Sequence, residues 1–231
     1  MPTVLITGAS RGIGLEFVRQ YLADDWRVLA CCRNPASADK LTALAAASDG
    51  RVTVHALDVD DAGNARGLAA ELDGTAIDVL INNAGITGHR DNGLGSMDYE
   101  AWEAALRTNV LGPMKVTEAL IDLLLAGEQK KLVTISSRMG SIGENAAANA
   151  ITYRSSKTAV NMVMSCLANG LADKGVTAVC FHPGWVQTDM GGPNAAVTPE
   201  DSVTGMRQVI GKLTPRDNGT FRNFDGGKIA W

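Results

Sequence analysis

Short apolar runs alternate along the chain with longer stretches in which apolar residues recur at helical spacing. The apolar runs predict strands near residues 3–7, 27–32, 52–57, 78–82, 131–136, 177–182 and 219–223. The helical stretches predict helices near residues 13–24, 36–47, 61–72, 98–126, 152–173 and 199–211. This alternation is typical of a doubly wound α/β fold, in which a mostly parallel, here seven-stranded, sheet carries helices on both faces. We therefore expect a ligand crevice at the carboxyl ends of the strands.

Composition allows one well-filled domain and argues against two classes of partner. The 231 residues, 45% of them hydrophobic, contain no Pro/Ser-rich or charge-run linker, so we expect a single domain over 1–231. A net charge of −4 without a basic cluster disfavours nucleic acid. No apolar stretch approaches the roughly 18 residues of a membrane span, and no basic segment leads into a signal-peptide core. The expected location is the cytoplasm, with no membrane partner.

The cysteines and histidines form no metal-binding pattern. Metal-ligand and Cys-x-x-Cys spacings are both missing among the cysteines, which are Cys31, Cys32, Cys166 and Cys180. The histidines are equally scattered, at positions 55, 89 and 182. We expect buried, reduced thiols and no metal site.

A glycine-rich turn follows the first predicted strand. Gly8, Gly12 and Gly14 lie between the apolar run 3–7 and a stretch of helical periodicity. Glycines at this point let the backbone turn tightly, bring the helix close to the sheet and expose helix N-terminal amides that hold a pyrophosphate. Glycines in such a turn can also serve packing alone. The strand before the turn and the helix after it favour a dinucleotide site, and hence a Rossmann-type fold.

Tyr153 and Lys157 are four residues apart in a predicted helix, so that a phenol and an ammonium lie on one face. A free phenol keeps its proton up to a pH of roughly 10, and it exchanges that proton at neutral pH only when a positive charge stabilises the phenolate. Lys157 supplies this charge. An isolated Tyr-x-x-x-Lys is more often a solvated pair without consequence, so the rest of the chain must support the catalytic interpretation.

An ordered set of motifs resembles the short-chain dehydrogenase/reductase family over nearly the whole chain. The motifs are Thr7 to Gly14, Asp58-Val59, Asn82-Asn83-Ala84-Gly85, Asn109, Ser136-Ser137, Tyr153 with Lys157, and Pro183 to Thr188. Each match alone is weak, whereas the ordered set is specific. The segment His182 to Met190 and the end Phe224 to Trp231 look most like a small carbonyl-reductase-like branch.

The resemblance implies a nicotinamide cofactor. The implied binding residues are Gly8, Ser10, Arg11, Gly12, Ile13, Gly14, Arg33, Asn34, Asp58, Val59, Asn82, Ala84, Gly85, Tyr153, Lys157, Pro183, Gly184, Val186 and Thr188. At position 33, NAD-preferring members usually carry an acidic residue for the ribose 2′-hydroxyl. A guanidinium instead grips a 2′-phosphate, and Arg11 offers a second positive charge, so NADP is expected in preference to NAD. The alternative is that Arg33 is merely solvated at a strand end.

The resemblance also implies a catalytic set of Asn109, Ser137, Tyr153 and Lys157. Tyr153 would protonate the substrate carbonyl oxygen, Lys157 would hold the nicotinamide ribose, and Ser137 would hydrogen-bond the same carbonyl oxygen. Ser136 stays an alternative to Ser137, although adjacent residues of a strand face opposite sides. Asn109 would lock a helix kink and hold a water that relays protons to Lys157. On its own, a mid-helix Asn is more often a satisfied polar residue.

The loops that follow the catalytic strands are expected to form the pocket rim, at about 86–97 and 187–211. Met139, Trp185 and Met190 are candidates for its apolar side chains, although they can equally be packing residues. Thr198 and Pro199 predict the cap and first turn of a short helix after a glycine hinge. This arrangement suits a lid, and equally an ordinary connection.

The expected function is the NADPH-dependent interconversion of a small ketone or aldehyde and its alcohol. The alternative is a cofactor-binding sensor or signalling protein on the same scaffold, with incidental turnover. The long helices near 98–126 and 152–173 look like those through which family members associate, so a homodimer or homotetramer is expected.

Overall fold

The computed structural model describes residues 1–88 and 93–231, and they form a seven-stranded sheet in the order β3-β2-β1-β4-β5-β6-β7. Every pair of neighbouring strands is parallel. The strands are β1 (Thr3–Thr7), β2 (Arg27–Cys32), β3 (Val52–Ala56), β4 (Val79–Asn82), β5 (Lys131–Ile135), β6 (Thr177–His182) and β7 (Thr220–Asn223). The predicted doubly wound fold is therefore confirmed, and the sheet is parallel throughout.

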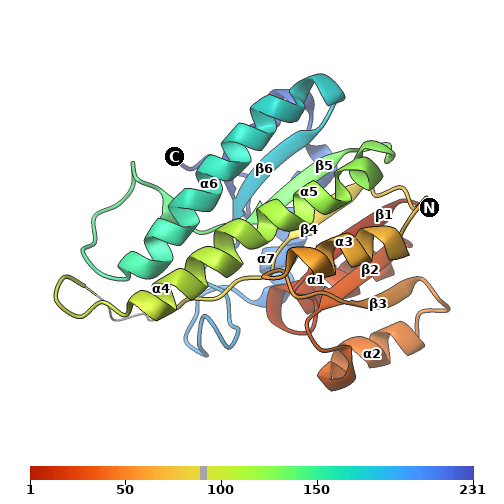
Figure 1. Ribbon diagram of the computed structural model, residues 1–231, viewed down its shortest axis with the longest axis horizontal. Coiled ribbons are helices and arrows are strands. Elements are labelled where there is room, and N and C mark those ends of the chain that lie inside the picture. The colour runs from red at the N-terminus through yellow and green to blue at the C-terminus, as the bar shows by residue number, and fades with distance from the viewer. Residues whose placement is uncertain (89–92) are drawn as a thin grey trace.

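Helices cover both faces of this sheet (Figure 1). They are α1 (Gly12–Ala23), α2 (Asp39–Ala46), α3 (Ala62–Glu71), α4 (Tyr99–Leu106), α5 (Gly112–Leu125), α6 (Ile151–Leu171) and α7 (Pro199–Lys212). The apolar cluster on one face takes side chains from α1, α2 and α7, and the cluster on the other face takes them from α3, α5 and α6. Because both faces are covered, the inner strands are mainly continuous apolar runs, whereas the edge strand β3 alternates apolar residues with Thr53 and His55.

The order of the strands in the sheet determines which loops lie side by side at its carboxyl edge. β1 lies between β2 and β4, so the chain winds outward in both directions from the centre of the sheet. The loops after β1 and β4 are therefore neighbours at the carboxyl edge, although 70 or more residues separate them in sequence. This switch in strand order is the place where ligands of such sheets bind.

Two elements differ from the sequence prediction. The helix expected over 98–126 is interrupted by a π-helical segment, Arg107–Leu111, between α4 and α5. Such single-turn interruptions are frequent at functional sites, and this one contains Asn109. The helix expected over 36–47 is shorter because a 3₁₀ turn at Pro35–Ser37 precedes α2.

The cysteines are free thiols, but the expectation that all are buried was wrong for one of them. Cys31, Cys32 and Cys180 are buried, whereas Cys166 is exposed on α6. The helical periodicity of α6 turns this position away from the sheet.

Candidate active site

A cleft of about 820 Å³ lies at the carboxyl edge of the sheet, within the range of roughly 300–1,000 Å³ that is usual for ligand sites. It runs from the residues after β2, past the glycine-rich turn after β1 and the end of β4, to α6 and the loop after β6. The predicted residues in its wall are Gly8, Ser10, Arg11, Gly12, Ile13, Gly14, Arg33, Asn34, Asp58, Val59, Ala84, Gly85, Tyr153, Lys157, Pro183 and Thr188. The fold thus brings motifs from the whole chain to one cavity.

The glycines of the turn divide into two roles. Gly8 and Gly12 have φ of 67° and 54°, values that a side chain disfavours. A Cβ on Gly14 would lie 2.2 Å from the main-chain oxygen of Gly8, so this glycine serves the close packing of α1 on the turn. Close packing therefore accounts for Gly14, and at Gly8 it adds to the positive φ, since a Cβ there would lie 2.9 Å from Ala84 Cα.

Asn83 fixes the glycine turn against the neighbouring strand, a role that the sequence analysis did not assign. Its Nδ2 donates to the main-chain oxygens of Thr7 and Gly8, at 2.9 and 3.2 Å. Its main-chain N–H donates to Thr7 Oγ1 at 3.0 Å. In the sequence, the signal for this role of Asn83 was its position as a polar residue directly after a buried strand. The amide holds the carboxyl ends of β1 and β4 in register at the cleft.

The far end of the cleft, beyond β2, is basic. Arg33 and Lys40 both line the wall and are exposed, with Asn34 and Ser37 between them. In the part of the chain that the structure describes, neither cation is in an ion pair. Lys40, in the first turn of α2, was missed by the sequence analysis because it belongs to none of the recognised motifs. Two cations without protein partners are available for an anionic group.

Arg11 has a partner on the other wall of the cleft. Its Nη1 lies 2.6 Å from Asp189 Oδ2, and both side chains are about three-quarters exposed, at 73% and 75%. This ion pair joins the glycine turn to the loop after β6. In this arrangement the Arg11 charge is directed to Asp189, whereas Arg33 and Lys40 form the basic end.

Tyr153 and Lys157 are neighbours in the wall, with Lys157 Nζ 5.7 Å from the centre of the Tyr153 ring. Lys157 is buried, and its Nζ donates to the main-chain oxygen of Ile135 at 2.9 Å. Burial lowers the pKa of Lys157 from 10.5 to about 8, and the nearby Cys180 opposes this slightly. The ammonium is therefore largely charged at neutral pH, next to the phenol.

The two serines after β5 are held differently. Ser136 lies in the cleft wall, but its hydroxyl donates to Asn161 Oδ1 in α6 at 2.6 Å. Ser137 Oγ accepts from the Met139 N–H at 3.2 Å, so its own O–H remains able to donate. The Ser136 hydroxyl thus gives its hydrogen to a partner within the protein. The Ser137 hydroxyl keeps a hydrogen that it could donate to a substrate oxygen.

Asn109 is almost fully buried, with 1% of its surface exposed, and its side chain makes three hydrogen bonds. Its Oδ1 accepts from the Ile86 N–H, and its Nδ2 donates to the Ile86 main-chain oxygen, both at 2.8 Å. Nδ2 also donates to Ser156 Oγ at 3.0 Å. Asn109 therefore joins the π-helical segment to the loop after β4 and to α6. Its contact in α6 is Ser156, which lies between Tyr153 and Lys157 in the sequence.

Five predicted site residues do not line the cleft, namely Asn82, Asn109, Ser137, Gly184 and Val186. The buried Asn82 side chain donates to Thr117 Oγ1 in α5, because alternation along β4 turns it to the opposite face. Val186 is buried, and a main-chain bridge joins it to Val197. At Gly184, φ is 86°, which supports the expected sharp turn after β6.

The rim prediction of 86–97 is only partly covered, since 89–92 lie outside the described residues. In the second stretch, Gln187, Thr188, Asp189, Met190 and Pro199 line the cleft. Thr198 caps α7 by accepting from the Asp201 N–H, as predicted. Trp185 is exposed, and its Nε1 donates to the Gly191 main-chain oxygen at 2.8 Å.

The residues present fit a phosphorylated dinucleotide. The glycine turn with positive φ stands at the N-terminus of α1, the basic end offers two unpaired cations, and Tyr153 with Lys157 lies at the opposite end. Fold and site together define a dinucleotide-binding oxidoreductase of the short-chain type.

Comparison with known proteins identifies the family. Residues 2–197 match the short chain dehydrogenase family, so the chain belongs to it, and the resemblance read from the sequence is confirmed. C-signal of Myxococcus xanthus is 42% identical over 155 residues, 67% of this chain and 93% of that protein. The 1-hydroxy-2-glutathionyl-2-methyl-3-butene dehydrogenase of Rhodococcus sp. (strain AD45) is 35% identical over all of both chains.

Among solved structures, the NADPH-bound carbonyl reductase from chicken fatty liver superposes with a TM-score of 0.92. It is 35% identical, and the match covers 100% of this chain and 99% of that one. The chain is therefore carbonyl-reductase-like. Within the described residues, none of the helices combines the length and apolar character needed to cross a bilayer.

Proposed function

We propose that this protein reduces a ketone or aldehyde with NADPH, and oxidises the alcohol in reverse, with Tyr153 as the general acid and base. The observation that carries the proposal is that Tyr153 and the buried cation of Lys157 line the same cleft as the glycine turn and the basic end. The bound cofactor supplies the hydride. The protein's own residues then need only orient the carbonyl and deliver a proton to its oxygen.

Tyr153 donates the proton to the carbonyl oxygen, and the neighbouring ammonium of Lys157 favours the phenolate that remains. Ser137 donates a hydrogen bond to the same oxygen, where negative charge develops during the reaction. Asn109, tied to Ile86 and Ser156, keeps the π-helical segment against α6 and so positions the Tyr153 and Lys157 pair. A water held near Asn109 would return protons towards Lys157.

NADPH is proposed in preference to NADH because of the basic end. Arg33 and Lys40 offer two cations to a 2′-phosphate at this end of the cleft, and the similar carbonyl reductase from chicken fatty liver was solved with NADPH bound. At the end of β2, the residue is Arg33 and not the carboxylate that would bind the ribose 2′-hydroxyl of NADH. The remaining cofactor contacts are proposed for the glycine turn, Asp58 with Val59, and the loop from Pro183 to Thr188.

The test is NADPH oxidation against a panel of small carbonyl compounds, with wild type and Tyr153→Phe compared. The substitution should lower kcat by about 10²–10⁴, the usual contribution of a positioned acid, and leave NADPH binding intact. Tyr99→Phe is the matched control, since Tyr99 is 67% exposed on α4 and stacks on Trp102. Turnover that survives in Tyr153→Phe would contradict the assigned role.

A second candidate is a cofactor-binding signalling protein, which the 42% identity to C-signal favours. Such a protein needs the cofactor cleft but no turnover. Tight NADPH binding without tyrosine-dependent reduction of any carbonyl in the panel would favour this candidate. The complete set of Asn109, Ser137, Tyr153 and Lys157 supports the enzyme instead.

A homo-oligomer is proposed from the surface of the α4, α5 and α6 helices. Tyr99, Met114 and Met162 are apolar side chains of these helices that the monomer leaves exposed. Burial of such side chains between copies is favourable. Light scattering should give at least twice the monomer mass of 24.2 kDa, and a monomer would contradict the proposal.

A further inference from the structure

The loop that follows β3 lies along the π-helical segment between α4 and α5. Asp60 Oδ2 accepts from Thr108 Oγ1 at 3.0 Å, and Arg107 Nε lies 4.0 Å from the same oxygen. Among the described residues, the other carboxylate oxygen of Asp60 has no hydrogen-bond partner. Asp60 and Thr108 are both half-buried and line the cleft. A carboxylate from one strand end therefore holds the first half of the segment.

The main chain of the same loop is held independently of the Asp60 side chain. Lys115 Nζ, from α5, donates to the Asp60 main-chain oxygen at 2.6 Å. The Asp60 N–H donates to Asp58 Oδ1 at 3.0 Å. Val59 packs closely on the start of α5, since a Cβ on Gly112 would lie 3.0 Å from Val59 Cγ2. The Asp60 carboxylate therefore projects towards the π-helical segment from a fixed backbone.

The winding of the segment decides what its side chains can reach. The Gly112 N–H donates to the Arg107 main-chain oxygen, five residues earlier, which is the hydrogen bond of a π-turn. Because this turn is wider than an α-turn, a return to α-helical winding would rotate the side chains about the helix axis. Thr108 and Asn109 are neighbours and point about a quarter of a turn apart. In the π-helical winding, the first reaches the loop after β3 and the second reaches α6.

Asn109 links the position of the segment to the helix that carries the proposed acid. Its Nδ2 donates to Ser156 Oγ at 3.0 Å, and the Ser156 hydroxyl donates to the Tyr153 main-chain oxygen at 2.8 Å. Asn109 and Ser156 are both almost fully buried, so water does not compete for these bonds. A hydrogen-bonded path therefore leads from the loop after β3, through the π-helical segment, to the backbone of Tyr153.

We propose that Asp60 is a positioning residue for the reaction. By holding Thr108, its carboxylate keeps the π-helical winding that directs Asn109 to α6, and so keeps the proposed catalytic pair of α6 in place beside the cleft. A hydrogen bond to an ionised acceptor is stronger than one between neutral groups, so a single contact can favour one winding over the other. Asp60 acts through the segment and does not need to touch the reacting atoms. This inference rests on the proposed reductase function.

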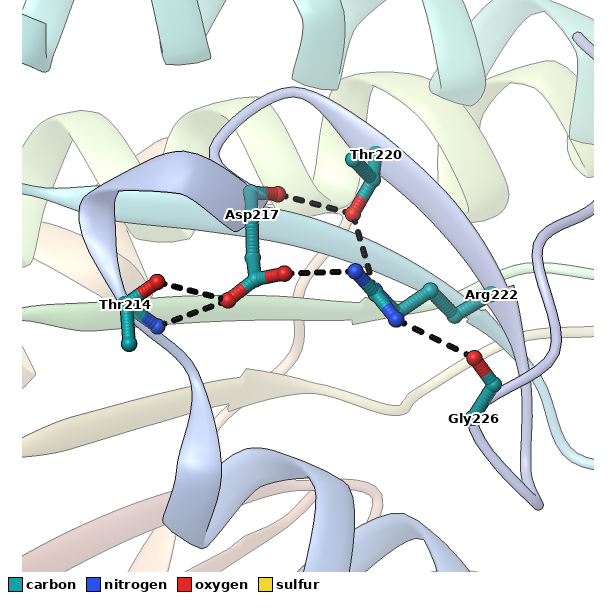
Figure 2. A network of polar contacts seen from close by, with 5 residues as sticks. All are labelled: Thr214, Asp217, Thr220, Arg222 and Gly226. Atoms are coloured by element: carbon teal, nitrogen blue, oxygen red, sulfur yellow. Dashed lines mark hydrogen bonds and ion pairs between the residues drawn. The ribbon is translucent and has the colours of Figure 1, made fainter.

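The experiment removes either side of the bond and then restores it. Thr108→Val lacks the donor, Thr108→Ser regains it, and Asp60→Ala lacks the acceptor. Thr214→Val is the matched control, because Figure 2 shows the same kind of bond, with the Thr214 hydroxyl donating to Asp217 at 2.9 Å, and neither residue lines the cleft. For each variant, kcat, KM for the carbonyl, affinity for 2′,5′-ADP and hydrogen exchange over 104–112 are measured.

Thr108→Val and Asp60→Ala should each lower kcat by about 10–100-fold, as for a misplacement of about 1 Å, and should speed exchange over 104–112. KM and the affinity for 2′,5′-ADP should stay within about twofold, because the main-chain contacts of the loop remain. The double variant should be no slower than Asp60→Ala alone, since both changes remove the same bond. Thr108→Ser should be close to wild type, and Thr214→Val should change neither kcat nor exchange over 104–112.

Full kcat in Thr108→Val, or losses that add in the double variant, would overturn the proposal. A fall in 2′,5′-ADP affinity as large as the fall in kcat would also overturn it, because Asp60 would then act on the cofactor directly. Should Asp60→Ala fail to fold, the comparison of Thr108→Val with Thr108→Ser decides the question. Absence of carbonyl reduction by wild type would instead defeat the proposed function, while exchange over 104–112 would still decide whether Asp60 holds the segment.

Discussion

Two regions of the cleft wall, the glycine turn and the end with Tyr153 and Lys157, are built in different ways. At the glycine turn, local backbone geometry dominates, because positive φ at Gly8 and Gly12 and the missing side chain of Gly14 shape the wall. At the end with Tyr153 and Lys157, the neighbouring segments after β5 depend on partners distant in sequence, such as Trp231 for Gly143 and Asn161 for Ser136. The glycine turn can be recognised from a short motif, whereas the contacts of the second region form only in the folded chain.

This difference has a functional reason. A pyrophosphate has a constant shape, so a short, fixed backbone turn is enough to bind it. Substrates vary, and loops supported by a rigid scaffold can change without disturbing the sheet. The following substitutions test whether the two ends respond separately.

The largest effect is expected for Lys157→Met, at the end of the cleft that holds Tyr153. Turnover should fall by about 10²–10⁴, because the phenol of Tyr153 loses its neighbouring charge. The same change should raise the free energy of unfolding at pH 7 by about 1–3 kcal/mol, since one pKa unit corresponds to about 1.4 kcal/mol and burial lowers the pKa of Lys157 to about 8. Enzyme kinetics and chemical denaturation measure the two effects.

The buried ammonium of Lys157 should make the stability of the protein depend on pH. Between pH 8 and its ordinary value of 10.5, the unfolded chain binds more protons at this site than the folded chain. Wild type should therefore gain stability relative to Lys157→Met as pH rises through this window, and kcat of the wild type should fall as the ammonium is lost. A stability difference that is constant from pH 7 to 10.5 would contradict the buried charge.

The paired variants Ser137→Ala and Ser136→Ala should separate chemistry from packing. Loss of the Ser137 hydroxyl should lower kcat by about 10²-fold, the cost of removing one donor to a developing oxyanion. Ser136→Ala leaves Asn161 without its 2.6 Å donor and should cost about 1–3 kcal/mol of stability, with a much smaller change in kcat. The opposite assignment would follow if Ser136→Ala abolished turnover in a fully folded protein.

A smaller effect is confined to the basic end. Arg33→Ala and Lys40→Ala should each weaken binding of 2′,5′-ADP by about tenfold or more, as expected for a lost charge-assisted hydrogen bond, and change binding of ADP little. Calorimetry with both nucleotides measures the preference directly. Equal affinity of wild type for the two nucleotides would remove the NADP assignment, and substrate KM should stay unchanged in both variants.

The smallest effect is expected for Arg11→Ala. Its exposed ion pair with Asp189 should contribute about 0–1 kcal/mol. Binding of 2′,5′-ADP and ADP should therefore weaken little and equally, in contrast to Arg33→Ala. A selective loss for 2′,5′-ADP would return Arg11 to the 2′-phosphate site that the sequence suggested.

The sequence alone determined the doubly wound fold, since each strand and helix is marked by the spacing of apolar residues along its own stretch of chain. It also located most of the residues that the structure places in the cleft wall, because the motifs are contiguous and each carries its own local geometry. Only the tertiary structure showed that Ser136 is bonded to α6, that Asn82 faces away, and that Lys40 rather than Arg11 stands unpaired beside Arg33. It also revealed the docking of residues 228–231 on the loop 141–145. These features join residues far apart in the chain, and their contacts depend on side-chain direction and strand order, which neither periodicity nor motif spacing specifies.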